Sequence, residues 1–363
     1  MHVLCTGGGT AGHVVPAIPV MQKLIEQGHR VSFVGSRSGL EARLLADLPV
    51  AYHGISAGKL RRYLSAQTLF DAVKVLIGIA EAIVLLGRLR PDVVFSKGGF
   101  VSFPVVLAAW LWRVPVVAHE SDLTPGLANR LALPFIRSLC VNFPDTRPVR
   151  FSGTVIYTGT PVRQMLLAGD ADRGRRLLGV DAVRPILLVT GGSLGADRLN
   201  SVVRASLDEL LPGIEVVLVC GPGKGSDIRR PGYHEFEFVS EPWGDLLASA
   251  AVVMSRAGAN TLYELLCLGK ANILVPLSRR ASRGDQIENA AYAEARGFSR
   301  VVQEEALEPQ RLVALVRETL AAGQSGRMAG FQPPDSVRLL CEAILTTAGE
   351  RSRTTTAKSG KHN

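Results

Sequence analysis

The sequence alternates short apolar runs with longer amphipathic segments, and this alternation restricts the possible fold more than any other feature. The runs of the first half are typical of buried strands, and the segments between them have helical periodicity. The expected strands of this half are Val3–Thr6, Val31–Gly35, Tyr52–Ile55, Val93–Ser96 and Val116–Ala118. Repeated strand–helix units predict a parallel sheet that is covered by helices on both faces.

The alternation starts again in the second half, with expected strands at Ile186–Thr190, Val216–Cys220, Phe236–Val239, Val252–Ser255 and Ile273–Pro276. A chain of 363 residues exceeds one ordinary hydrophobic core and indicates two domains. We therefore expect an α/β protein of two doubly wound, Rossmann-like domains that face each other across a cleft. The expected domains are residues 1–160 and 161–349, joined near Tyr157–Pro161. The last helix is a candidate to pack back on the first domain, and we expect residues 350–363 to be disordered.

A glycine-rich turn, Gly7-Gly8-Gly9-Thr10-Ala11-Gly12-His13, follows the first expected strand. Glycines let a backbone approach a ligand closely, and the helix after the turn offers N–H groups to an anion. The spacing of the glycines also fits the dinucleotide-binding fingerprint. That interpretation requires a carboxylate for the ribose after the second strand, and none occurs before Glu41, beyond the usual spacing of about 20 residues. We therefore interpret the turn as an anion-binding loop of another kind.

The cysteines and the hydropathy pattern favour a cytoplasmic protein without a membrane span. The five cysteines are far apart and have neither a disulfide framework nor a metal-ligand spacing, which favours reduced thiols in the core. The start of the chain lacks the basic and apolar regions of a signal peptide. The longest candidate for a membrane span, Gly98–Trp112, has 15 uncharged residues, contains Pro104 and is shorter than the roughly 20 residues that cross a bilayer.

Positive charge gathers in the first half, where residues 1–160 carry +7 of the formal net charge of +9. Five of these cations flank an aliphatic helix expected over Leu69–Leu86; they are Arg61, Arg62, Lys74, Arg88 and Arg90. The pattern fits a patch that faces anionic lipid, where each cation contributes about 1 kcal/mol. A core helix with solvated basic ends fits equally well, and both interpretations stay open here. Nucleic-acid binding is not indicated, because interleaved aromatic residues and a known binding module are absent.

Two turns of the second half are suited to a diphosphate. Gly191–Gly195 and Arg256–Ala259 each follow an expected strand, and the second turn precedes a helix that we expect to start at Asn260 or Thr261. Both turns can offer backbone N–H groups to an anion. Glu264, about one turn into that helix, can accept hydrogen bonds from the two hydroxyls of a ribose. A capping box with Thr261 is the alternative for this carboxylate.

Six motifs together resemble the MurG family, the N-acetylglucosaminyltransferases that convert lipid I to lipid II. They are Gly7–His13, Ser96–Ser102, His119–Asn129, Gly191–Gly195, Ser255–Glu264 and Arg283–Asn289, in the order of the family. The resemblance implies a GT-B fold and an inverting transfer of N-acetylglucosamine from UDP-N-acetylglucosamine to the 4-hydroxyl of the muramoyl sugar of lipid I. It also implies a peripheral enzyme at the cytoplasmic face of the plasma membrane.

The resemblance further implies roles for single residues. The donor-binding residues would be Thr10, Ala11, Gly12, Arg163, Ser193, Val239, Gly258, Asn260, Thr261, Glu264, Asp285, Gln286 and Asn289. The acceptor-binding residues would be Gly9, Gly98, Gly99, Phe100 and Asp122. His13 is the first candidate for the base that takes the proton of the attacking hydroxyl, and His119 with its neighbour Glu120 is the second. No cluster of His, Asp or Cys residues has metal-ligand spacing, so we expect Arg163 and helix ends to stabilise the leaving diphosphate without a metal or other cofactor.

Four positions depart from the family pattern. Ala11 replaces a glycine, so its backbone must adopt angles that alanine tolerates. Phe100 and Asp122 stand where many members have tyrosine and asparagine, as in a Gram-positive variant of the family. Asp285 stands at a glutamine position and can accept hydrogen bonds from sugar hydroxyls but cannot donate them. Val239 matches a position whose backbone meets uracil, and we expect its side chain to belong to the core.

Two other kinds of function fit the sequence less well. The first is another UDP-sugar enzyme of the same fold, either a glycolipid glycosyltransferase or a UDP-N-acetylglucosamine 2-epimerase. An epimerase should have more carboxylates in the turns of the first domain than Glu120 and Asp122. The second is a non-catalytic protein that binds a nucleotide sugar at the membrane surface, which would keep Glu264 and Gln286 but would not need His13.

Overall fold

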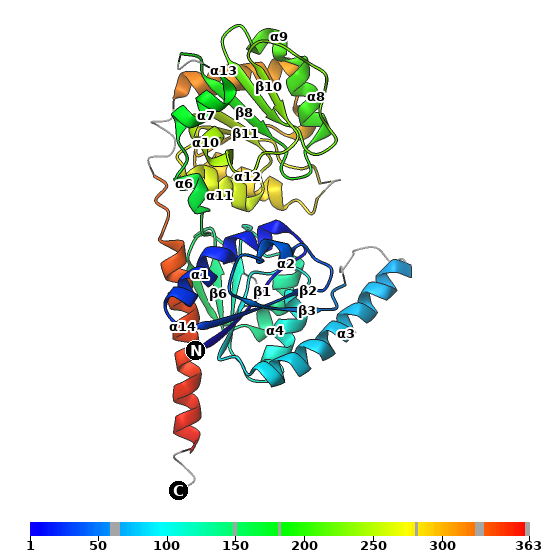
Figure 1. Cartoon of the computed structure of the whole chain (residues 1–363), viewed down its shortest axis with the longest axis vertical. Helices are drawn as coiled ribbons and strands as arrows, with labels where there is room; N and C mark the ends of the chain where they lie inside the picture. The colour runs from blue at the N-terminus through cyan, green and yellow to red at the C-terminus, as the bar shows by residue number, and fades with distance from the viewer. Residues whose placement is uncertain are drawn as a thin grey trace. The chain divides into compact units, whose positions relative to one another are not determined.

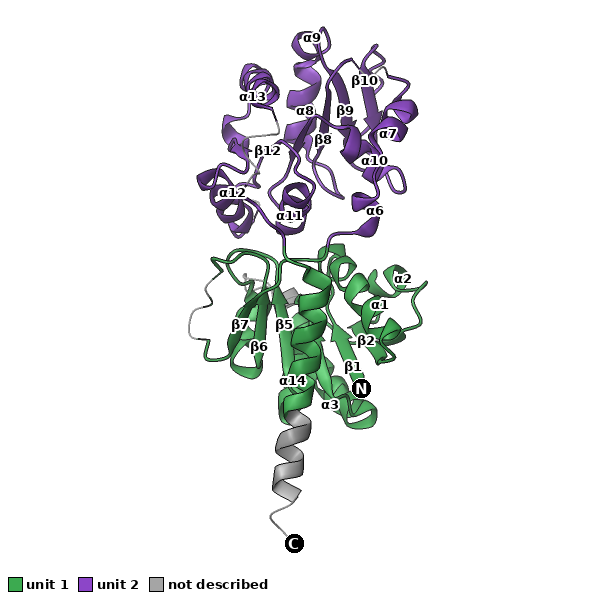
Figure 2. Ribbon diagram, turned by 90° about the vertical axis from the view of Figure 1, so that its left-hand side faces the viewer, with its two compact units in different colours: residues 1–161, 334–363 green, residues 162–333 purple. Residues whose placement is uncertain are grey.

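The computed structural model describes residues 1–58, 66–146, 148, 151–180, 183–279, 282–323 and 330–359. The chain forms two compact units, one of Met1–Pro161 with Pro334–Asn363 and one of Val162–Pro333 (Figure 1, Figure 2). Each unit has its own parallel sheet, with apolar clusters on both faces of that sheet. The expected fold class, two doubly wound α/β units, is confirmed.

The sheet of the first unit has the strand order β3-β2-β1-β4-β5-β6-β7, and all neighbouring strands are parallel. Its strands are β1 (His2–Thr6), β2 (Arg30–Ser36), β3 (Ala51–Ile55), β4 (Val93–Ser96), β5 (Val116–Glu120), β6 (Ser138–Val141) and β7 (Thr154–Tyr157). Side chains alternate between the two faces of the sheet. Val3 and Cys5 join the core on one face and Leu4 joins the core on the other, which explains why β1 is apolar throughout.

Helices cover both faces of this sheet. They are α1 (Ile18–Glu26), α2 (Glu41–Leu44), α3 (Ala66–Leu89), α4 (Ser102–Leu111), α5 (Leu127–Ala132) and α14 (Ser336–Ser359), with short 3-10 turns η1 (Ala11–His13), η2 (Val15–Ala17) and η3 (Leu133–Phe135). Apolar residues of α1 and α14 share one core, and those of α3 and α4 share the other.

Helix α14 comes from the end of the chain and packs on the first unit (Figure 2). Its residues Leu340, Ile344 and Ala348 are buried in the core that α1 also lines. The helix continues to Ser359, whereas the sequence led us to expect disorder from residue 350. A helix whose first turns are fixed by packing can continue into an exposed segment, because each further residue adds one backbone hydrogen bond without a new nucleation step. Residues 360–363 lie outside the described part of the chain.

The sheet of the second unit has the strand order β10-β9-β8-β11-β12-β13, again with parallel neighbours. Its strands are β8 (Ile186–Thr190), β9 (Glu215–Val219), β10 (Tyr233–Phe236), β11 (Val252–Ser255), β12 (Asn272–Leu274) and β13 (Arg300–Val301). Its helices are α6 (Gln164–Leu167), α7 (Ala171–Leu178), α8 (Asp197–Ala205), α9 (Leu207–Leu210), α10 (Trp243–Ser249), α11 (Ala259–Cys267), α12 (Asp285–Ala295) and α13 (Pro309–Ala322), with the 3-10 turn η4 (Glu304–Ala306). Residues of α8, α9 and α13 line one core, and those of α7, α10 and α11 line the other.

The structure corrects the set of strands that we expected from the sequence. The structure adds β6, β7 and β13, which the sequence pattern did not predict, and it places β10 at Tyr233–Phe236 rather than Phe236–Val239. β6 is a buried strand between β5 and β7, but it has only four residues and begins with a polar serine. β7, β10 and β13 lie at sheet edges, where a strand does not need a continuous apolar run, because it is not buried as a central strand is. β7 and β13 contain no fully buried residue, and β10 has the polar residues His234 and Glu235 between Tyr233 and Phe236.

Candidate active site

The turns that follow β1 and β4 are in direct backbone contact at the carboxyl ends of these two strands. β1 and β4 are parallel neighbours, so their carboxyl ends lie side by side. The N–H of Gly8 donates to the carbonyl of Gly98 at 3.3 Å. Gly99 has a φ of 86°, and a Cβ there would lie 2.1 Å from the Gly8 carbonyl oxygen, so only glycine fits. Three of the expected acceptor residues, Gly9, Gly98 and Gly99, therefore belong to one backbone surface.

His13 lies at the end of the first glycine turn, in η1. Its Nδ1 is 3.0 Å from the Thr10 hydroxyl, a contact that orients the imidazole ring. If Nδ1 carries the ring hydrogen and donates to Thr10, the lone pair of the neutral ring is on Nε2, as a general base requires. Ala11 also lies in η1. Its backbone therefore has helical angles that alanine adopts without strain, as we expected for an alanine at this position. Phe100 is half-buried beside Gly9.

The side chain of Glu41 packs against the first glycine turn and stabilises its conformation. The sequence did not lead us to expect this role. The carboxylate is completely buried and accepts a hydrogen bond from the Gly9 N–H at 2.8 Å. A Cβ on Gly8 would lie 2.1 Å from the same oxygen, so the glycine makes room for the carboxylate. The one signal for this role was an acidic residue that follows the second strand, and we had considered that residue only as a ligand of a ribose.

Glu120 uses its carboxylate to shape the loop after β5. One oxygen accepts from the Asp122 N–H at 2.9 Å, and the other accepts from the Gly126 N–H and from Asn129 Nδ2, both at 2.9 Å. The side chain is 5% exposed. Three donors already surround this carboxylate, and the geometry therefore favours a positioning role over the catalytic role that we had considered. Asp122, the expected acceptor ligand, lies half-buried on the loop that Glu120 holds.

His119 is buried inside the first unit. Its Nε2 is 2.8 Å from the carbonyl oxygen of Gly159, and its Nδ1 is 2.7 Å from Lys97 Nζ. Burial, followed by the nearby Lys97 charge, holds the pKa of His119 well below its usual value. A ring with both nitrogens engaged and no exposure is poorly placed to receive a substrate proton. Between the two histidines, the geometry favours His13 as the base.

The glycine turns of the second unit follow β8 and β11. Ser193 is exposed on the first of these turns. Gly258 is the N-cap residue of α11, which begins at Ala259, one residue before the expected start, and includes Asn260 and Thr261. The N-terminal end of a helix carries partial positive charge and free N–H groups, both of which suit a diphosphate.

Arg163 and Glu264 form a bidentate ion pair within the second unit. Arg163 Nε donates to Oε1 at 2.9 Å, and Arg163 Nη2 donates to Oε2 at 3.0 Å. The side chains are 33% and 14% exposed, respectively. Sequence reasoning placed both residues in the donor site but did not pair them, because they are 101 positions apart. The pair fixes the carboxylate of Glu264 on the second turn of α11.

The start of α12 is tied to the neighbouring loops by two of its three expected donor ligands. Gln286 Oε1 accepts from the Leu277 N–H at 3.1 Å, and Asn289 Nδ2 donates to the Ala257 carbonyl at 3.2 Å. Asn289 is fully buried and thereby links α12 to the turn before α11. Asp285 is partly exposed and lies 3.3 Å from Arg283 Nε. Asp285 and Gln286, both partly exposed, are therefore better placed than Asn289 to meet a sugar hydroxyl.

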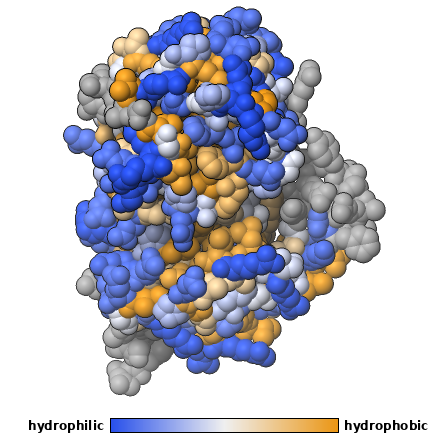
Figure 3. Space-filling model, turned by 45° about the horizontal axis from the view of Figure 1, so that its top comes forward, coloured by the Kyte–Doolittle hydropathy of each residue, from blue (hydrophilic) through white to orange (hydrophobic). Residues whose placement is uncertain are grey.

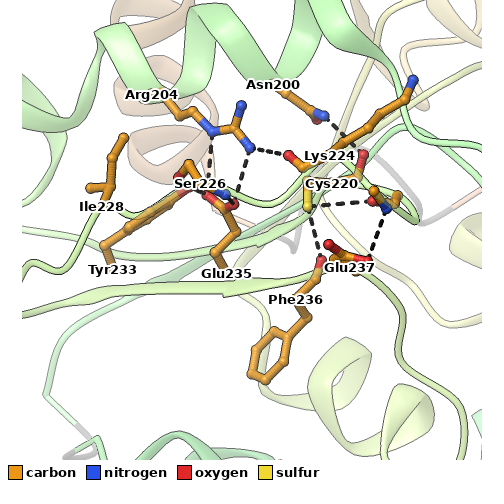
Figure 4. Close-up of polar contacts among 12 residues, drawn as sticks. Asn200, Arg204, Cys220, Lys224, Ser226, Ile228, Tyr233, Glu235, Phe236 and Glu237 are labelled. Atoms are coloured by element: carbon orange, nitrogen blue, oxygen red, sulfur yellow. Dashed lines mark hydrogen bonds and ion pairs between the residues drawn. The ribbon is translucent and has the colours of Figure 1, made fainter.

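Figure 4 shows a polar network around Glu235 of β10, the strand that precedes Val239 in the sequence. Arg204 of α8 pairs with Glu235 of β10 at 3.0 Å. Glu235 also accepts from the N–H and the hydroxyl of Ser226, at 2.5 and 2.9 Å, and from the hydroxyl of Tyr233. The network thus joins α8, the β9–β10 connection and an edge strand. The Val239 side chain packs against the apolar core, as we expected from the sequence.

Three of the five expected membrane-patch cations, Lys74, Arg88 and Arg90, are exposed on or next to α3. Arg61 and Arg62 lie outside the described residues. The same helix exposes Leu76 and Val84, whose side chains are 67% and 53% accessible. Figure 3 shows that hydrophobic residues reach the molecular surface between hydrophilic ones. Within the described residues, no helix is long and apolar enough to cross a membrane.

No arrangement of three or more His, Cys, Asp or Glu side chains suited to a metal ion occurs within the described ranges. The five cysteines are all free thiols, and four of them are buried.

Family models and individual relatives both assign this chain to the same protein family. The N-terminal domain of glycosyltransferase family 28 matches residues 3–141, and the C-terminal domain of that family matches residues 186–330. Two similar proteins, from Legionella pneumophila (strain Paris) and Lachnospira eligens, are each named UDP-N-acetylglucosamine–N-acetylmuramyl-(pentapeptide) pyrophosphoryl-undecaprenol N-acetylglucosamine transferase. They are 47% and 48% identical over 321 residues, which is 88% of this chain and 88% and 91% of theirs.

Two solved structures are also similar. The crystal structure of Acinetobacter baumannii MurG superposes with a TM-score of 0.75 at 27% identity, over 95% of this chain and 99% of that one. A UDP-GlcNAc 2-epimerase from Neisseria meningitidis, bound to UDP-GlcNAc, reaches a TM-score of 0.69 at 16% identity, over 95% of this chain and 100% of that one. The second likeness concerns the fold alone.

Proposed function

The chain belongs to glycosyltransferase family 28, and we propose that it transfers N-acetylglucosamine from UDP-N-acetylglucosamine to lipid I, giving lipid II. Two relatives of nearly equal length carry the name of this transfer. The protein is thus a UDP-N-acetylglucosamine-dependent glycosyltransferase that acts in peptidoglycan synthesis. The attacking group is the 4-hydroxyl of the muramoyl sugar.

The proposed chemistry is a single displacement. The acceptor hydroxyl oxygen bonds to the anomeric carbon of N-acetylglucosamine as the bond from that carbon to the β-phosphate oxygen breaks. UDP leaves with the electron pair, and the hydroxyl proton passes to Nε2 of His13. One displacement at the anomeric carbon inverts its configuration. The observation that carries this assignment is the contact between Thr10 and His13, which sets the imidazole on the glycine turn.

The second unit would hold the donor. Backbone N–H groups at the start of α11 and at Ser193 would bind the diphosphate, and Arg163 would offset the charge of the leaving group. The Glu264 carboxylate accepts from Arg163 and still has lone pairs for the two ribose hydroxyls. Asp285 would accept from a sugar hydroxyl. Phe238, 66% exposed next to Val239, is available to the uracil ring.

The direct test is an assay with purified protein, UDP-N-acetylglucosamine and a lipid I analogue, run with and without EDTA. We expect UDP and a disaccharide product in equal amounts. A donor that is isomerised when no acceptor is present would indicate an epimerase instead. Binding of UDP-N-acetylglucosamine with no turnover of either kind would indicate a non-catalytic binding protein.

The change Glu264→Ala should weaken donor binding. A charge-assisted hydrogen bond to a ribose hydroxyl contributes about 1.5 to 3 kcal/mol, so the dissociation constant for UDP should rise roughly 10- to 150-fold in calorimetry. Glu318→Ala is the matched control, because it removes the carboxylate of another arginine pair of the same unit, 2.7 Å from Arg300. An affinity for UDP that both variants leave unchanged would remove Glu264 from the donor site.

We propose that the first unit also binds the membrane surface, through the exposed cations and apolar residues of α3, which places the enzyme peripherally at the cytoplasmic face. Reversal of Lys74, Arg88 and Arg90 to glutamate should therefore lower binding to anionic vesicles at low salt, with turnover on a water-soluble acceptor retained. The control reverses Arg176, Arg229 and Arg311, three exposed cations of the second unit. Equal vesicle binding by the two triple variants would contradict a patch on α3.

A further inference from the structure

Lys97 is a buried lysine that the proposed chemistry does not use. It follows β4, directly before Gly98 and Gly99, and is only 2% exposed. Its Nζ lies 2.7 Å from His119 Nδ1 and 2.7 Å from Ser121 Oγ. A buried ammonium group is costly unless it is hydrogen-bonded, so a lysine at the edge of a proposed substrate site calls for a functional explanation.

The directions of these hydrogen bonds follow from the chemistry of the partners. The Gly159 carbonyl can only accept, so His119 Nε2 carries the ring hydrogen that points to it. The neutral ring then has its lone pair on Nδ1, which accepts from Lys97. An ammonium group has three donors and no acceptor, so Ser121 Oγ must also accept from Lys97. The hydroxyl hydrogen of Ser121 is therefore directed away from Lys97.

We propose that Lys97 is a positioning residue that makes Ser121 a hydrogen-bond donor to an oxygen of the acceptor substrate. Ser121 is half-exposed at the carboxyl end of β5, on the loop that Glu120 shapes and that carries Asp122. The loop is next to the glycine turn after β4, since β4 and β5 are neighbours in the sheet. This inference rests on the proposed function, because it assigns the acceptor to that edge of the first unit.

The interaction is sensitive to pH near neutrality. Burial lowers the pKa of Lys97 to about 7, while the charges of Glu120 and Asp122 and the Cys140 group raise it and so keep it from falling further. Below pH 7 the group is mainly an ammonium ion, and Ser121 donates outward. Above pH 7 the neutral amine gains a lone pair and can accept from Ser121, which turns the hydroxyl inward. Donation to the acceptor substrate is thus lost as the pH rises.

The test compares the KM values of acceptor and donor between pH 6 and 9 for the full-length parent protein and four variants. In the parent, the acceptor KM should rise about 10-fold over this range, with the donor KM nearly constant, because one hydrogen bond is lost. Ser121→Ala and Lys97→Met should both show the high acceptor KM already at pH 6, with no pH dependence. Ser121→Thr keeps the hydroxyl and should restore the parent profile.

Lys270→Met is the matched control. Lys270 is also buried, in the second unit, but its Nζ donates to the backbone carbonyls of Ala248 and Ala250 rather than to a side-chain hydroxyl. This variant should keep the parent acceptor profile. If Lys97→Met does not fold, Ser121→Ala decides alone. The inference is overturned if the parent protein is active but its acceptor KM does not change with pH. It is also overturned if the Ser121→Ala variant keeps the pH dependence of the acceptor KM. A parent protein without any activity contradicts the proposed function instead.

Discussion

Replacement of His13 by alanine should lower kcat about 100- to 10,000-fold, the usual contribution of a general base. UDP-N-acetylglucosamine should still bind, because the residues proposed to hold it belong mainly to the second unit. The acid limb of the pH profile should also change, since an imidazole with a reference pKa near 6.5 no longer titrates. Steady-state kinetics between pH 5 and 9, with calorimetry for the donor, measure both effects.

Two further variants make the test of His13 specific. His29→Ala removes a half-exposed histidine elsewhere in the first unit and should leave kcat unchanged. Thr10→Val removes the hydroxyl 3.0 Å from Nδ1 but keeps the shape of the side chain, so it should lower kcat by about 10-fold through loss of ring orientation. A His13→Ala variant with kcat within a few-fold of the parent, and with the same acid limb, would make His13 a structural residue of the turn.

Most of the central strands were predictable from the sequence, whereas the edge strands β7, β10 and β13 were not. β4, β8 and β11 have the boundaries that the apolar runs indicated, because parallel central strands are buried on both faces. β10 starts three residues earlier than expected, at Tyr233, and its Glu235 is paired with Arg204 rather than exposed to solvent. An ion pair with a distant helix leaves no periodic signal in the strand that contains it.

The site could be predicted as far as it depends on local chemistry. A glycine turn followed by a histidine is visible in the sequence, and the structure places both at the end of β1. The groups that hold the site come from distant positions. Glu41 reaches the Gly9 N–H across 32 residues, and Arg163 reaches Glu264 across 101. The sequence does not distinguish Lys97 from an exposed cation, because composition does not reveal that the fold buries it against His119.

A positioning role and a catalytic role of Glu120 predict different effects of its substitution on stability and on kcat. Glu120→Ala removes a carboxylate that accepts three hydrogen bonds and leaves their donors unsatisfied. Each buried unsatisfied group costs about 1 to 3 kcal/mol, so the free energy of unfolding should fall by about 3 kcal/mol or more. This loss is a large part of the free energy of unfolding of a typical protein, which is about 5 to 15 kcal/mol. Denaturant unfolding, followed by circular dichroism, measures the loss.

Glu120→Gln separates the two roles, because it keeps the size of the side chain. Its amide group must place an NH₂ against at least one N–H donor, whichever way the amide is turned, so a positioning role predicts a stability loss of about 1 to 3 kcal/mol and a raised acceptor KM. Glu26→Gln, which changes an exposed carboxylate paired with Lys23, should alter stability by less than about 0.5 kcal/mol. A Glu120→Gln variant that unfolds like the parent but loses kcat about 100-fold would instead show that the carboxylate takes part in proton transfer, because only the chemical step would then depend on its charge.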